Sequence, residues 1–286
     1  MKKNFIGGII AIAVVLVLTV GVLFYFTQIK SGNTADDNPA ASSSVDESGL
    51  SQQKLEVKET EKTDDFKWED PKKEELQKKF ADLKAINPET VAYIYIPGSQ
   101  LDEPVVQTKD NEKYLNTTFD GGQQPFMGTV FMDMDNKPDF DNRLTWLFGH
   151  ARGSKVEDHR MFNDVNFYSD TKFMDDHPYC VVQTPNGRIF YEVMFFCIVP
   201  ETTAFYQTDF KDDADFKELL TEVSKTASVT SDHFVIDEKS EYMVLSTCRE
   251  EDVTIRANLY LKRIPDKEID QLLKDKGDFL EYKPTR

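Results

Sequence analysis

A chain of 286 residues, of which 40% are hydrophobic and 30% charged, can bury one well-packed domain with extensions but not two large domains. Its formal net charge of −17 argues against nucleic acid as a partner, because phosphate binding needs a basic face. The same charge argues against electrostatic adhesion to anionic lipid.

The N-terminal region predicts a membrane anchor. Residues 5–26 form an uncharged stretch long enough to cross a bilayer as a helix. Lys2 and Lys3 precede it and acidic residues dominate the segment after it, so residues 1–4 are expected in the cytoplasm and the rest outside the cell. A cleaved signal peptide is the alternative, but it would have a shorter apolar core that ends at a small-residue site. We therefore expect an uncleaved single-pass anchor in the cell membrane.

A flexible stalk and then a helix are predicted to follow the anchor. Residues 27–70 are rich in Ser, Ala, Asp, Glu and Lys, a composition that cannot bury enough apolar surface to offset the entropy of ordering. In residues 71–86, the apolar side chains of Leu76, Phe80 and Leu83 recur at helical spacing. The folded domain is expected over residues 71–264.

From residue 91 the apolar period becomes that of strands separated by turn residues. Eight strand-like runs follow, without regular alternation with helices: 91–98, 104–107, 128–132, 144–148, 179–184, 188–200, 242–248 and 254–264. The pattern predicts a mainly β fold, an eight-stranded closed or nearly closed barrel.

Two further helices are predicted beside the barrel strands. One, residues 212–225, lies in the connection between the sixth and seventh strands, where binding loops tend to be found. The other, residues 266–276, is expected to end at Gly277 within a charged C-terminal tail, residues 265–286.

The chain has three cysteines, so at least one thiol has no partner within it. Cys180 and Cys197 flank a predicted hairpin with its turn at Asn186-Gly187. In that register Cys180 faces Val193, about 13 Å along the strand from Cys197 and beyond the reach of a disulfide. We interpret both as small buried hydrophobic residues, which leaves Cys248 to be explained.

Three residues at strand ends predict acyl transfer through a thioester. Cys248 ends the apolar run 242–248, His150 follows the run 144–148, and alternation in the run 254–261 places Arg256 on its polar face. A thiolate is the reactive nucleophile, a histidine exchanges its proton, and a fixed guanidinium stabilises an oxyanion. Each residue alone has an ordinary structural explanation, so the argument lies in their joint occurrence.

No metal site and no cofactor are predicted. His159, His177 and His233 lie in polar loops without the spacing of zinc ligands. Residues 133–136 are similar to the start of a calcium loop but lack its glycine and terminal glutamate.

In these residues the chain resembles a class B sortase, a membrane-anchored transpeptidase of Gram-positive bacteria. The likeness covers roughly residues 71–264 and rests on these motifs: Ile96-Pro97-Gly98, Pro104-Val105-Val106-Gln107, Asp110-Asn111 with Tyr114-Leu115, Gly128-Thr129-Val130-Phe131-Met132-Asp133, Phe148-Gly149-His150, Met161-Phe162 and Leu245-Ser246-Thr247-Cys248. The helix predicted between the sixth and seventh strands is similar to the insertion that separates class B from class A sortases.

The resemblance implies a sortase barrel with His150, Cys248 and Arg256 at the catalytic positions. Cys248 would attack the Thr carbonyl of a C-terminal sorting motif of the Asn-Pro-x-Thr type on a secreted protein. An amine, usually from the peptidoglycan precursor, would resolve the thioacyl enzyme. Ser246 and Thr247 are expected to bind substrate.

Three alternatives remain open at this point. A pilin-polymerising sortase would use a pilin lysine as the acceptor; the lid and C-terminal membrane helix common in class C relatives are not evident here, but some class B sortases also build pili. A non-catalytic, wall-facing binding module predicts a buried, unreactive Cys248. A plain cysteine protease would orient its histidine with Asn or Asp, and the sequence singles out no such residue.

Overall fold

The computed structural model describes residues 66–123, 128–151, 160–202, 205–248 and 254–285. The predicted cytoplasmic N-terminus (1–4), the predicted anchor (5–26) and all but the last residues of the predicted stalk (27–70) lie outside these ranges. Within them, no helix combines the length and apolar character that crossing a membrane requires.

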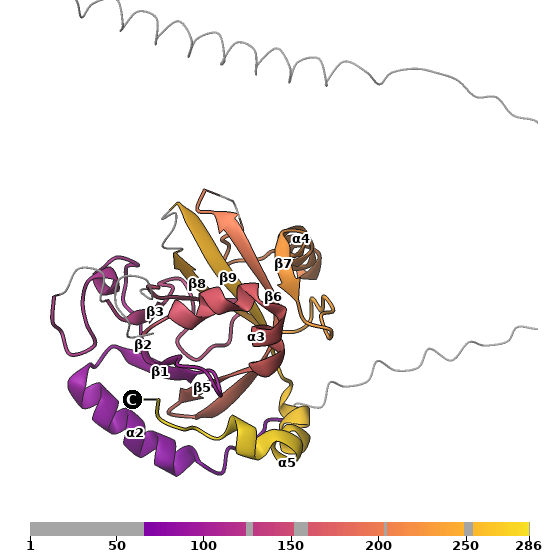
Figure 1. The fold of residues 1–286 in the computed structure, drawn as a ribbon. Coiled ribbons are helices and arrows are strands. Elements are labelled where there is room, and N and C mark those ends of the chain that lie inside the picture. The colour runs from indigo at the N-terminus through magenta and orange to yellow at the C-terminus, as the bar shows by residue number, and fades with distance from the viewer. Residues whose placement is uncertain (1–65, 124–127, 152–159, 203–204, 249–253, 286) are drawn as a thin grey trace, which may run out of the picture. The chain divides into compact units, whose positions relative to one another are not determined.

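The described strands form one sheet in the order β5-β1-β2-β3-β4-β8-β9-β6-β7, and β5 also pairs with β6 (Figure 1). That last pairing closes eight strands into a barrel, as predicted, and leaves β7 outside the closed ring. The strand bounds are β1 (Thr90–Tyr95), β2 (Asp102–Val106), β3 (Val130–Met132), β4 (Leu144–Phe148), β5 (Tyr179–Thr184), β6 (Gly187–Pro200), β7 (Ala227–Thr230), β8 (Tyr242–Cys248) and β9 (Ile255–Arg263).

Two parallel pairings within this largely antiparallel barrel determine which strand ends lie together. β2 runs parallel to β3, and β4 runs parallel to β8 with Phe148 opposite Ser246. Because parallel neighbours end at the same edge of a sheet, the residues after β4 and the end of β8 lie together.

Four α-helices and three 3₁₀ helices surround the described barrel strands: α2 (Lys73–Ile86), η1 (Lys113–Leu115), η2 (Asn163–Ser169), α3 (Thr171–Asp176), α4 (Asp213–Ser224), η3 (Asp266–Glu268) and α5 (Ile269–Leu280). The N-terminal helix α2 and the helix α4 after the sixth strand were both predicted. The Asp212 side chain accepts hydrogen bonds from the Ala214 and Asp215 amides and so caps α4.

The outer face of β9 differs from the prediction. Its inward residues Ala257, Leu259 and Leu261 belong to the barrel core, as expected. The opposite face was expected to be polar, but Tyr260 is fully buried there and stacks on Phe195 with ring centroids 4.5 Å apart. This second core lies on the side of the sheet that α4 covers, so only the two ends of β9 present polar groups to solvent.

The hairpin between β5 and β6 also differs from the prediction. Thr184 pairs with Gly187, so the turn residues are Pro185 and Asn186, and Cys180 faces Tyr191 instead of Val193. Gly187 has φ +140, where a Cβ would come within 3.0 Å of the Asp70 side chain. Both hairpin cysteines are free and buried, and burial raises the pKa of the Cys197 thiol to about 12.

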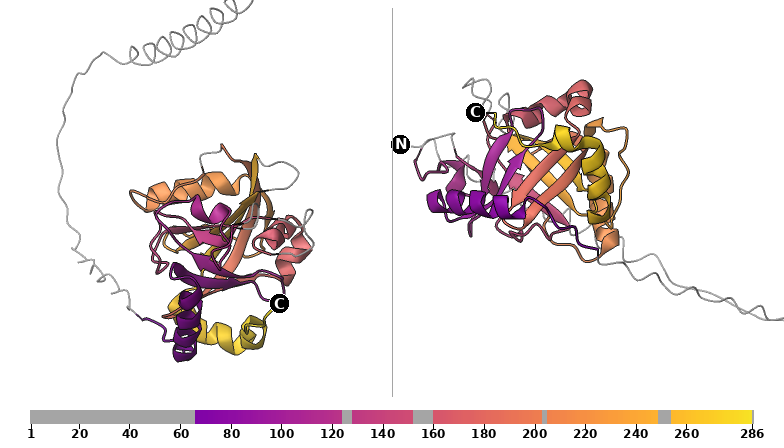
Figure 2. Two further views of the ribbon diagram at one scale, coloured as in Figure 1. Left: turned by 90° about the vertical axis from the view of Figure 1, so that its left-hand side faces the viewer. Right: turned by 90° about the horizontal axis from the view of Figure 1, so that it is seen from below.

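The C-terminal segment packs against the barrel. Gly277 was expected to end the last helix, but α5 continues to Leu280, which is fully buried and accepts a 2.8 Å hydrogen bond from the Tyr95 hydroxyl at its carbonyl. Helices α2 and α5 both cover the side of the barrel formed by β1 and β5 (Figure 2). Burial of the apolar face of α5, with Ile269 at its start, outweighs the weak helix preference of one glycine.

Candidate active site

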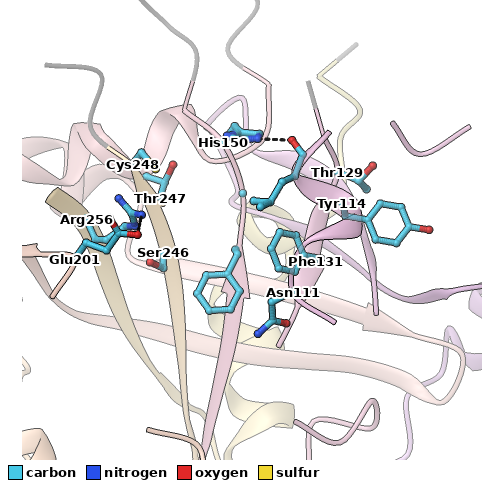
Figure 3. A pocket seen from close by; sticks show the side chains of 13 residues that line it. Asn111, Tyr114, Thr129, Phe131, His150, Glu201, Ser246, Thr247, Cys248 and Arg256 are labelled. Carbon is cyan, nitrogen blue, oxygen red and sulfur yellow. Dashed lines mark hydrogen bonds and ion pairs between the residues drawn. The ribbon is translucent and has the colours of Figure 1, made fainter. Parts of the chain in front are cut away.

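The structure brings His150, Cys248 and Arg256 to one groove. Cys248 is the last residue of β8 and pairs directly with Arg256 of β9. Gly149 donates a 3.2 Å backbone hydrogen bond to the Ser246 carbonyl, and this bond extends the β4–β8 pairing to the residue before His150. All three predicted residues line a cavity of about 250 Å³ (Figure 3).

Cys248 is the accessible thiol among the cysteines. Cys180 and Cys197 are buried, whereas Cys248 is partly exposed at the groove. Directly paired residues on antiparallel strands project from the same face, so the side chains of Cys248 and Arg256 share the outer face of the barrel. The thiolate is the form of cysteine that reacts with carbonyl carbon.

The His150 imidazole is held by the main chain. Its Nε2 lies 2.7 Å from the carbonyl oxygen of Leu115, at the end of η1. A carbonyl can only accept a hydrogen bond, so Nε2 is the donor in this contact. Gly128 packs against the same ring: a Cβ there would lie 3.1 Å from the imidazole Cδ2 and 2.4 Å from the Tyr114 carbonyl oxygen.

Arg256 has an acidic partner that the sequence did not indicate. Its Nη2 donates to the carboxylate of Glu201, the residue after β6, and its Nη1 donates to the Ile255 carbonyl at 3.3 Å. Glu201 is 55 residues away in the sequence and lies in a connection without a catalytic motif, so no local signal predicts the contact.

The two predicted substrate-binding residues lie on different faces of β8. Ser246 pairs with Asn258 on the face that carries Cys248 and Arg256, whereas Thr247 pairs with Ala257 of the barrel core. Both line the cavity, with 4% and 2% exposure. Within the described part of the chain the Thr247 Oγ1 is buried without a hydrogen-bond partner.

The wall opposite Cys248 is largely aromatic. Phe131 and Phe148 line the cavity with ring centroids 5.3 Å apart, and Tyr114 lies beside them. The view in Figure 3 places Cys248, Arg256 and Glu201 on one side and Tyr114 and Thr129 on the other.

The suggested calcium-type loop has a structural role at this wall. The buried Asp133 carboxylate accepts from the Asn111 side-chain amide at 2.8 Å, from the Tyr206 hydroxyl at 2.5 Å and from the Asp135 amide at 2.9 Å. Burial and the hydrogen bond to Asp133 raise the pKa of the Tyr206 hydroxyl. No group of His, Cys, Asp or Glu residues in the described ranges could hold a metal ion.

The arrangement brings a thiol, an imidazole and a guanidinium together in one open groove, the groups that acyl transfer through a thioester would require. A carbonyl held between Cys248 and Arg256 would meet the thiol on one side and guanidinium N–H groups on the other. A groove of this kind suits a peptide segment.

No family model matches the chain. It is 31% identical over 176 residues to sortase B of Listeria monocytogenes, with 61% of this chain and 68% of the relative covered. It is 31% identical over 179 residues to sortase B of Staphylococcus aureus, with 62% and 70% covered. The chain is also similar to the solved complex of Staphylococcus aureus sortase B with substrate, with 29% identity and a TM-score of 0.60. The match covers 66% of this chain and 85% of the sortase B chain.

Fold, groove and relatives agree on a cysteine transpeptidase with a closed β-barrel. The chain belongs to the class B sortases. A structure of the Bacillus anthracis protein similar to sortase B, at 28% identity and a TM-score of 0.57, has the same fold over 65% of this chain and 83% of its own.

Proposed function

We propose that this sortase cleaves a C-terminal sorting motif of the Asn-Pro-x-Thr type and transfers the cleaved protein to an amine of the cell wall. His150, Cys248 and Arg256 are the catalytic residues in this proposal. The observation that carries it is the direct pairing of Cys248 with Arg256 at the mouth of a groove that also contains His150.

The first half of the reaction forms a thioester. The Cys248 sulfur attacks the Thr carbonyl carbon of the motif, and Arg256 stabilises the negative charge that develops on the carbonyl oxygen. The C–N bond to the following residue breaks, and the imidazolium of His150 gives its proton to the departing amine.

The second half regenerates the thiolate. The acceptor amine attacks the thioester carbonyl, a new amide bond forms, and the bond from carbon to the Cys248 sulfur breaks. His150 takes the proton that the amine loses, so each group returns to its starting state.

The substrate and acceptor classes are supported by the relatives. Staphylococcus aureus sortase B has been solved in a complex with substrate, and a sortase B has been solved in a complex with triglycine. A groove open to solvent, with aromatic side chains on one wall, is suited to an extended peptide in this chain as well.

The location of the reaction follows from the proposed domain organisation. Residues 5–26 would anchor the chain in the cell membrane with residues 1–4 in the cytoplasm, and residues 27–70 would form a stalk that places the catalytic domain, 71–264, outside the cell. The end of the proposed stalk departs from this division, because the Trp68 backbone amide donates to Asp266 at 3.0 Å and so ties residues before 71 to the folded unit.

The test uses the purified full chain in detergent with fluorogenic peptides that carry Asn-Pro-x-Thr or unrelated motifs. A wall-type glycine peptide, a pilin-type lysine peptide or no acceptor is added, and products are identified by mass spectrometry. We expect motif-selective cleavage and an amide-linked product with the wall-type amine. A product with the lysine peptide alone would assign the chain to pilin polymerisation.

Matched variants separate catalytic loss from misfolding. Cys248→Ala, His150→Ala and Arg256→Ala should each abolish cleavage. Cys197→Ala and His233→Ala, which change the same residue types away from the groove, should retain it. Intact cleavage by Cys248→Ala would refute the assignment of the nucleophile.

A further inference from the structure

Arg256 lies between two strands that both contribute to the groove. Its backbone pairs with Cys248 of β8 on one side and with Val199 of β6 on the other. The chain therefore leaves β6, at Pro200, close to Arg256.

Glu201 is fixed to the strand that carries Arg256. Its amide donates a 2.7 Å hydrogen bond to the Thr254 carbonyl, just before β9 begins. Its carboxylate accepts from the guanidinium Nη2, while Nη1 donates to the Ile255 carbonyl at 3.3 Å. Figure 3 shows the Glu201 and Arg256 side chains side by side at the edge of the groove, next to Cys248.

The ion pair is too exposed to serve mainly as a source of stability. The Arg256 side chain is 24% exposed and that of Glu201 is 55% exposed. Solvent-exposed ion pairs contribute little to the free energy of unfolding, because water screens the charges and both long side chains lose conformational freedom. Stabilisation of an oxyanion, by contrast, depends on a donor already directed at the place where the charge develops.

We propose that Glu201 is a positioning residue, whose carboxylate holds the Arg256 guanidinium in the orientation that the peptide carbonyl requires. This proposal rests on the proposed function and adds a residue that does not touch the reacting atoms. Since one nitrogen faces Glu201 and another the Ile255 carbonyl, rotation of the planar guanidinium is restricted on both sides.

The test compares Glu201→Ala and Glu201→Asp with wild type. It uses the full chain and, as substrate, the sorting peptide that the wild type cleaves. Glu222→Ala is the matched control, because Glu222 is 53% exposed and forms an ion pair with Lys225 on α4. We expect Glu201→Ala to lower kcat about 10- to 100-fold. KM should change less than about threefold, and Glu201→Asp should restore part of kcat because it retains the charge.

A second readout follows Arg256 itself and needs no activity. Phenylglyoxal modifies accessible arginine side chains, and mass spectrometry measures the rate at Arg256. Release from Glu201 should raise that rate severalfold in Glu201→Ala and leave it unchanged in Glu222→Ala.

Two outcomes would overturn the positioning role. One is a kcat for Glu201→Ala within twofold of wild type or above it; the other is an unchanged rate of Arg256 modification. If wild type cleaved no sorting peptide, the proposed function would fail, and the modification rate would still decide whether Glu201 holds Arg256.

Discussion

The His150 imidazole and the Leu115 carbonyl oxygen form a 2.7 Å hydrogen bond that joins the end of β4 to the helix η1. A carboxylate partner, as in the Ser-His-Asp triad of serine proteases, would add a negative charge beside the imidazole. A carbonyl orients the ring without that charge. The orientation of His150 therefore depends on the backbone path of η1 and of the glycine that packs on it.

Gly128→Ala should disable the site while the domain stays folded. A Cβ at Gly128 would lie 2.4 Å from the Tyr114 carbonyl oxygen and 3.0 Å from that of Leu115, and its φ of +42 is unfavourable for a side chain. The loop must shift, and His150 shifts with it. We expect kcat/KM for peptide cleavage to fall about 100-fold. Near-wild-type cleavage by a folded Gly128→Ala protein would show that the carbonyl contact is dispensable.

Gly277→Ala should raise the free energy of unfolding and leave the activity unchanged. Gly277 lies inside α5, and a Cβ there meets no atom within 4 Å. Replacing glycine in a helix interior reduces the entropy of the unfolded chain and should raise the free energy of unfolding by about 0.5–1 kcal/mol. Chemical denaturation followed by circular dichroism measures this, and a loss of stability would contradict the position of Gly277 inside the helix.

Ser246 and Thr247 should respond differently to removal of their hydroxyl groups. Thr247→Val replaces a buried Oγ1 without a described partner by a methyl group, so unfolding free energy should rise by about 1 kcal/mol with cleavage unchanged. Ser246→Ala removes a hydroxyl on the face of Cys248, and KM should rise about fivefold if it binds peptide. Equal effects of the two substitutions on KM would contradict this division.

Asp70 and Arg188 should make stability depend on pH in the acid range. Burial would raise the pKa of the Asp70 carboxyl, but hydrogen bonds from Arg188 and Lys72 and the guanidinium charge lower it below 3.8. A group with a lowered folded-state pKa contributes stability above its unfolded value, and that contribution disappears as pH falls through the folded value. Urea unfolding between pH 5 and pH 2 should therefore show a loss of stability that is smaller in Asp70→Asn, which keeps only the contributions of the other carboxylates.

Removal of the Asp70 side chain should be costly at neutral pH. The pair is only 1% and 6% exposed, and Asp70→Ala leaves the Arg188 charge buried without compensation. We expect a loss of about 3–5 kcal/mol. Asp141→Ala, which breaks a pair that is 71% and 64% exposed, should leave the free energy of unfolding nearly unchanged.

Strong local patterns predicted most of the barrel and the three groove residues. Every barrel strand coincides with a predicted apolar run, and strand ends correctly indicated Cys248, Arg256 and His150 as neighbours. The hairpin register was wrong because the Asn-Gly signal outweighed Pro185, which favours the second position of a turn.

Contacts between distant segments could not be predicted in the same way. Glu201 and Leu115 contact the groove residues only because the fold brings their segments together. Glu201 lies in no motif, and the Tyr114-Leu115 motif does not indicate a contact between the Leu115 carbonyl and His150. β7 is only four residues long, too short for the alternation of Ala227 and Val229 with Ser228 and Thr230 to distinguish it from a loop. The burial of Tyr260 on the outer face of β9 becomes understandable once α4 covers that side of the sheet.

The closure of the barrel has a consequence for self-association. Every described strand except β7 has neighbours on both sides, so the exposed edge of this sheet is only four residues long. Unpaired strand edges are templates for intermolecular pairing, and short ones offer few backbone groups to a second molecule. The protein can therefore reach high local concentration with little tendency to form edge-to-edge aggregates.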